Sequence, residues 1–72
     1  MMKEIANRNI FVKNAEEIRD ICAKQYVDIG VALDMYIANN KIKKNEEIMK
    51  QYQEFRELCR KHALNDIVEM LK

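Results

Sequence analysis

Cys59 and His62 are the residues whose types and spacing could support chemistry. They are three positions apart, so on a helix they would share one face. Residues 18–25 align with residues 55–62 as an internal repeat, in which Cys22 occupies the position of Cys59. A structural zinc site needs four ligands, and a cysteine nucleophile needs an oxyanion site and an orienting acid. Because the sequence supplies neither set, we predict no catalytic residue, no metal site and no cofactor.

The two cysteines are explained more simply as small apolar residues of a core, with His62 at its edge. A disulfide between Cys22 and Cys59 would require the helices that carry them to pack side by side. The N-terminus has an acid and amides where an export signal has its apolar region. We therefore expect reduced thiols and a cytoplasmic protein, in the host cytoplasm if the source is a virus or the protein is injected.

The composition predicts an all-α protein. The 72 residues include one Gly and no Pro, with 49% hydrophobic and 35% charged residues. Such a chain has little turn material, which favours helices over hairpins. We expect a single small helical domain over residues 1–72, made of three to four helices. A domain of this size buries only about 60% of the surface of its unfolded chain.

Capping residues indicate where the first helices begin. Asn14, with Glu17 three residues later, is a capping-box arrangement. Asp28 can cap a second helix, although one continuous helix over residues 15–39 also fits the apolar pattern. Gly30 is unfavourable inside a helix and favours a break near residue 26.

A connector over residues 39–45 leads to the next predicted helix. Asn45 is a suitable N-cap, and the two acids after it complement the helix dipole. The apolar stripe then continues over residues 46–61. Residues 64–72 form a separate short helix or extend this one.

The stretch from Tyr26 to Ile37 is apolar on every side of a helix, since nine of its twelve residues are apolar. Such a helix must be buried on all sides, and a chain of 72 residues has too little other material to cover it. We predict that the two amphipathic helices joined by the connector over 39–45 form an antiparallel hairpin, which dimerises into a bundle or binds another protein. The predicted partner or dimer interface comprises Tyr26, Ile29, Leu33, Tyr36, Ile37, Tyr52 and Phe55.

Residues 8–13 fit either a short strand or the continuation of a helical pattern. With a strand, the chain resembles a ribbon-helix-helix dimer with an extra C-terminal helix, because VALDMYI (residues 31–37) resembles the buried second helix of those repressors. That resemblance implies that the ribbon binds duplex DNA. Strand alternation would place Asn9, Phe11 and Lys13 on the groove side.

Protein binding without catalysis is the function that these features favour. The net charge of +1 argues against a strongly electrostatic nucleic-acid binder, and no apolar run approaches the roughly 20 residues that cross a bilayer. Residues 14–40 carry two bases and five acids, whereas residues 41–50 carry four bases and two acids. We predict a small regulatory or adaptor protein that binds a protein partner or forms a homodimer; the alternative is a ribbon-helix-helix transcriptional regulator that binds DNA.

Overall fold

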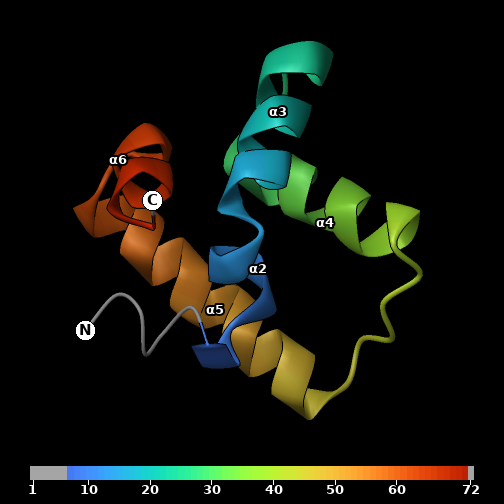
Figure 1. Ribbon diagram of the computed structural model, residues 1–72. Coiled ribbons are helices and arrows are strands. Elements are labelled where there is room, and N and C mark those ends of the chain that lie inside the picture. Colours follow the sequence, from blue (N-terminus) through green and yellow to red (C-terminus); the bar gives the residue numbers. More distant parts are fainter. Residues whose placement is uncertain (1–6, 72) are drawn as a thin grey trace.

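Helices joined by short connectors make up the part of the chain that a computed structural model describes, residues 7–71 (Figure 1). The helices with both ends in this range are α2 (Ile10–Lys13), α3 (Ala15–Gln25), α4 (Ile29–Asn39), α5 (Glu46–Lys61) and α6 (Leu64–Met70). Between residues 7 and 71 there is no strand. The predicted all-α fold is therefore confirmed, while the expected count of three to four helices is lower than the five that lie within residues 7–71.

Tyr26 and Asp28 separate α3 from α4. Tyr26 has a φ of 54°, in the left-handed region, and this conformation ends α3. Asp28 has an extended backbone, and its side chain accepts a hydrogen bond from the N–H of Val31 at 3.0 Å. Asp28 thereby caps α4. The predicted break near residue 26 is confirmed, and the continuous helix over residues 15–39 is wrong.

Asn45 begins α5 as predicted. Its side-chain oxygen accepts a hydrogen bond from the N–H of Ile48 at 2.9 Å. Glu46 and Glu47 occupy the first turn, where negative charge interacts favourably with the helix dipole. α5 ends at Lys61, and α6 is a separate helix rather than an extension of α5.

The ribbon considered for residues 8–13 is wrong, because a helical turn occupies its place. The Oδ1 atom of Asn9 accepts hydrogen bonds from the N–H groups of Phe11 at 2.9 Å and Val12 at 3.1 Å. At the other end, the Nδ2 atom of Asn14 donates to the first carbonyl of α2 at 2.9 Å and does not cap α3. Two side-chain amides thus satisfy the ends of α2, which local asparagine side chains do well.

Phe11 of α2 lies at the centre of the core. Its fully buried ring meets Tyr36 and Tyr52 edge to face, with centroid distances of 6.0 Å in both pairs, and lies 6.3 Å from Phe55. Each such pair contributes about 0.5–1.5 kcal/mol beyond its buried area. Because Tyr36 belongs to α4 and the other two rings to α5, one side chain joins three helices.

The helices pack in two groups around this ring cluster. α3 packs chiefly on α4 and also on α6, while α2 packs on α5 (Figure 1). α4 contacts α5 less extensively than it contacts α3. α4 therefore packs more extensively on α3 than on α5, the partner that the sequence suggested. Within residues 7–71, no helix covers the side of α4 that carries Val31 and Ala38.

Candidate protein-binding surface

The outer side of α4 is apolar and accessible. Residues on its inner side are buried: Ala32, Leu33, Tyr36 and Ile37. On the opposite side, Val31 is 45% exposed, Met35 is partly buried and Ala38 is exposed. Their spacing of four and three residues aligns them along one face of the helix. We call Val31, Met35 and Ala38 the α4 stripe.

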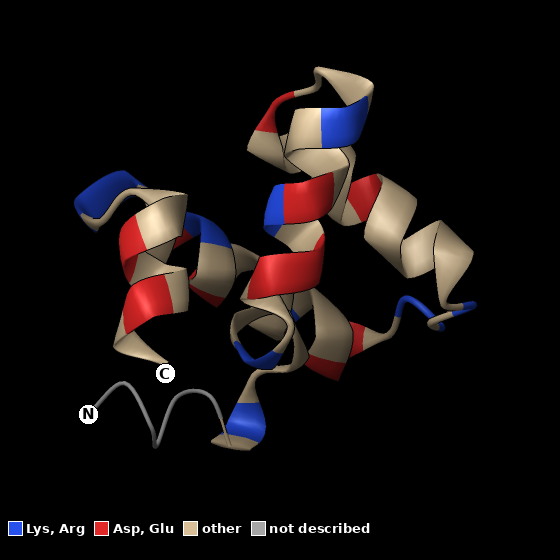
Figure 2. Ribbon diagram, turned by 45° about the horizontal axis from the view of Figure 1, so that its top comes forward, with Lys and Arg blue, Asp and Glu red and all other residues tan. Residues whose placement is uncertain are grey.

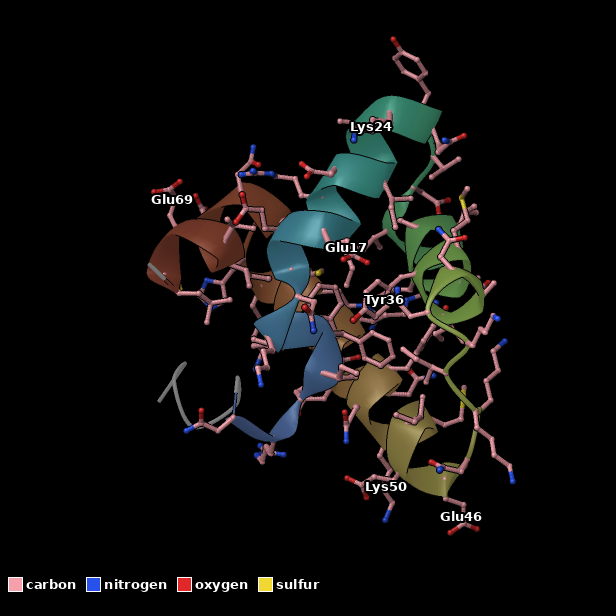
Figure 3. All side chains as sticks on the ribbon, turned by 45° about the vertical axis from the view of Figure 1, so that its right-hand side comes forward. Glu17, Lys24, Tyr36, Glu46, Lys50 and Glu69 are labelled. Atoms are coloured by element: carbon pink, nitrogen blue, oxygen red, sulfur yellow. The ribbon has the colours of Figure 1, made fainter. Side chains whose placement is uncertain are left out.

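The predicted interface residues fall into two groups. Five of them lie in the core of a single chain: Leu33, Tyr36, Ile37, Tyr52 and Phe55. Figure 3 shows Tyr36 pointing into the interior between the helices. By contrast, Tyr26 is 94% exposed and Ile29 is partly buried. In the folded chain, only these two of the predicted residues can meet a partner.

Sequence reasoning missed the residues of the α4 stripe. The signal that could have found them is the all-round apolarity of residues 26–37, since such a helix has apolar residues on whichever side remains free. Periodicity alone could not identify the free side. That side became defined only when α3 and the α2–α5 pair covered the other one.

Tyr26 combines an exposed ring with a strained backbone. A residue with a Cβ atom costs about 1–2 kcal/mol in the left-handed conformation, and helices more often end with Gly or Asn there. The ring is 94% exposed, so packing within the chain offsets little of this cost. Tyr26 is therefore a large aromatic side chain presented to solvent at the corner before α4.

Charged residues of opposite sign lie at the two ends of α4. Acidic residues gather on α3 and α6, whereas the connector between α4 and α5 is basic (Figure 2). The connector lysines, Lys41, Lys43 and Lys44, are exposed, and none forms an ion pair within residues 7–71. Asp28, at the start of α4, is exposed and likewise has no ion pair in that range. α4 thus begins beside an acid and ends beside bases.

Met49 on α5 is a second exposed apolar side chain, at 39%. It lies in a shallow depression with Glu46, Lys50 and Gln53, and Figure 3 shows Glu46 and Lys50 pointing outward near the start of α5. The other residues around Met49 are polar or charged. A single exposed apolar side chain is common on folded proteins, so Met49 serves as a reference for the α4 stripe.

The residues expected to enter a DNA groove have other positions. Asn9 and Phe11 are buried, and Lys13 is exposed. The Nδ2 atom of Asn9 donates to the carbonyl oxygen of Gln51 at 2.9 Å and to Oε1 of Glu54 at 2.8 Å. Asn9 therefore fastens α2 to α5, and Phe11 fills the core. Neither side chain can reach a base edge while the chain is folded.

Cys22 and Cys59 are free, partly buried thiols, and His62 is exposed at the end of α5. Within residues 7–71, no three His, Cys, Asp or Glu side chains are grouped as metal ligands. Burial raises the pKa of the Cys59 thiol to about 11; Cys22 adds to this rise and Arg56 opposes it. Burial and the charge of Asp28 also raise the pKa of Cys22. Both thiols are therefore poor nucleophiles at neutral pH.

Comparisons with protein-family models, with known proteins and with solved structures find no match for this chain. In the part that the structure describes, no helix is both long and apolar enough to cross a membrane. Function must therefore be inferred from geometry, burial and charge alone.

Proposed function

We propose that this chain is a non-enzymatic regulatory or adaptor protein that binds another protein molecule through the α4 stripe. The observation that carries this proposal is the uneven coverage of α4, whose residues other than Asp34 and Asn39 are apolar or Gly but which is buried only along Leu33, Tyr36 and their neighbours. A helix side with apolar residues at such spacing is a common recognition element for proteins. Tyr26 extends the surface past the start of the helix.

The energetics are consistent with an association site. Full burial of a Val or Met side chain contributes about 1.5–3 kcal/mol. The α4 stripe lies on a helix that is already formed, so the backbone loses little conformational entropy when a partner binds. Aromatic residues such as Tyr26 are enriched among the side chains that dominate binding energy.

The test replaces Val31 with Glu, which adds a charge to the middle of the surface without entering the core. Met49→Glu is the matched control, because Met49 is similarly exposed and lies on α5. The two variants and the parent chain are compared by binding of an apolar dye, by sedimentation from micromolar to millimolar concentration, and by thermal unfolding. We expect the parent chain to bind the dye and to associate, Val31→Glu to lose both properties, and Met49→Glu to keep them.

Equal unfolding temperatures of the variants and the parent would establish that folding is unaffected. A parent chain that stays a monodisperse monomer, and has no affinity for the dye, would refute the proposal. Loss of association in Met49→Glu instead of Val31→Glu would move the site to α5.

A further inference from the structure

We infer that the molecule bound by the α4 stripe is a second copy of this chain, with the two α4 helices packed antiparallel about a two-fold axis. The inference rests on the proposed function and names the partner of the same surface. Two-fold dimers use one self-complementary patch on both copies, so the patch must match itself when it is reversed.

The α4 stripe meets this requirement in its apolar part. Reversal about a point between residues 34 and 35 places Val31 opposite the second copy's Ala38, and the reverse pair forms by symmetry. A β-branched side chain thus faces a methyl group, which allows close approach of the helices. Met35, which is flexible, lies near the axis and can fill the remaining space. Asp34 lies on the flank towards α5, where the Tyr52 hydroxyl donates to it at 3.5 Å.

The charges at the two ends of α4 are also complementary on reversal. The same register brings exposed Asp28 of one copy to exposed Lys41 of the other, twice per dimer. Arg56, the cation that approaches the start of α4 near Gly30, stacks over the ring of Tyr52 at 6.0 Å and forms no ion pair within residues 7–71. Antiparallel helices additionally place the positive dipole end of one beside the negative end of the other.

The arrangement also accounts for Tyr26. In an antiparallel pair, Tyr26, which precedes α4, and the second copy's Lys43, which follows α4, lie at the same end of the dimer, where the ammonium group can sit over the aromatic face. The ring of Tyr26, which is exposed and lies on a strained backbone in the single chain, then contacts the second copy. Stable dimers bury about 800 Å² on each chain, and one side of an 11-residue helix with its two ends provides less. The dimer should therefore be weak and dependent on concentration.

Zero-length cross-linking of the native chain tests this register. Equal amounts of ¹⁴N- and ¹⁵N-labelled protein are mixed at high concentration, treated with a carbodiimide that joins adjacent carboxylates and amines, and analysed by mass spectrometry. We expect mixed-isotope peptides that join Asp28 to Lys41 or Lys43. Within one chain, α4 separates Asp28 from Lys41 by about 16 Å or more, so such a link must form between copies.

Charge variants provide an independent reading by sedimentation. Lys41→Glu should weaken dimerisation about tenfold, because each exposed pair contributes roughly threefold and occurs twice by symmetry. Adding Asp28→Asn, which keeps the helix cap, should restore part of the loss. Lys50→Glu is the matched control on α5, and it should leave dimerisation unchanged.

The absence of mixed-isotope links, or links that join lysines to Glu16, Glu17 or Asp20 of α3 instead, would overturn the antiparallel α4 pairing. The failure of this inference is distinguishable from failure of the proposed function. If Val31→Glu abolishes dye binding while the parent chain remains a monomer, the surface is a binding site for a different protein and the second copy is excluded. If Val31→Glu changes neither dye binding nor association, both conclusions fail together.

Discussion

Phe11 and Tyr26 are both aromatic residues next to a helix end, and their surroundings are opposite. Phe11 is fully buried and faces three other rings, whereas Tyr26 is 94% exposed and strained. Phe11 belongs to a short, polar-flanked segment, and Tyr26 opens the most apolar stretch of the chain. In this small protein, the most apolar segment is therefore not the most completely buried one.

The difference follows from which segments find partners. α2 is only one turn long, but Asn9 fastens it to α5 with two hydrogen bonds from one amide. α4 is longer and more apolar, yet the other helices of residues 7–71 cover only one side of it. The α2 region thus stabilises the fold, whereas the Tyr26–α4 region remains accessible for the association that we propose.

Phe11→Ala should give the largest effect. Truncation of a buried Phe costs about 3–5 kcal/mol, which is comparable with the whole stability of a domain this size. Chemical denaturation followed by circular dichroism should show a chain that is largely unfolded, while Phe11→Leu keeps a measurable transition at reduced stability. A small loss for Phe11→Ala, no greater than that for Tyr26→Ala, would remove the distinction between the two regions.

Asn9→Ala should follow, with a loss of about 2 kcal/mol in the free energy of unfolding. The variant loses the cap of α2 and the hydrogen bonds from the Asn9 amide to the carbonyl of Gln51 and to Glu54. Arg8→Ala is the control, since the Arg8–Glu54 ion pair of 2.8 Å is largely exposed on the arginine side and should contribute less than about 1 kcal/mol. Equal losses in the two variants would show that Asn9 is no more than a surface contact.

Tyr26→Gly should stabilise the monomer by about 1 kcal/mol relative to Tyr26→Ala. Both variants remove the ring, but only Gly relieves the cost of the left-handed backbone. Unfolding is measured at low concentration, where self-association does not contribute. If the Tyr26→Gly variant is less stable than Tyr26→Ala, the backbone at residue 26 is not strained. That result would contradict the free-energy cost assigned to the left-handed conformation of Tyr26.

The smallest effect is expected for Cys59, whose thiol reactivity reports on the interior at α5. With its pKa raised from 9.0 to about 11, Cys59 should be alkylated in the native chain at pH 8 about a hundredfold more slowly than in the unfolded chain. Because the pKa of Cys59 is higher in the folded chain than in the unfolded chain, the contribution of the thiol to the free energy of unfolding is present below pH 9. It is lost as the pH rises towards 11. Cys59→Ala should reduce this alkaline loss of stability, and an unchanged pH dependence would contradict a buried thiol.

Much of the helix pattern was predictable. Asp28 and Asn45 cap helices at the expected positions, and the break at residue 26 and the separate α6 are present. Asn14 lies at the expected helix start but uses its amide on α2 instead. Of the residues predicted for the interface, five lie in the core, and the residues of the α4 stripe that we propose were not among them.

The sequence by itself determined the all-α class, the helix boundaries set by caps, and the excess of apolar residues in residues 26–37. These properties depend on interactions within a few positions along the chain, such as an N-cap with an N–H three residues later. Only the tertiary structure decided that Phe11 is central, that Asn9 is buried, and which side of α4 stays free. Those outcomes depend on contacts between distant segments, as between Asn9 and Gln51, and local periodicity carries no information about which distant surface covers a given face.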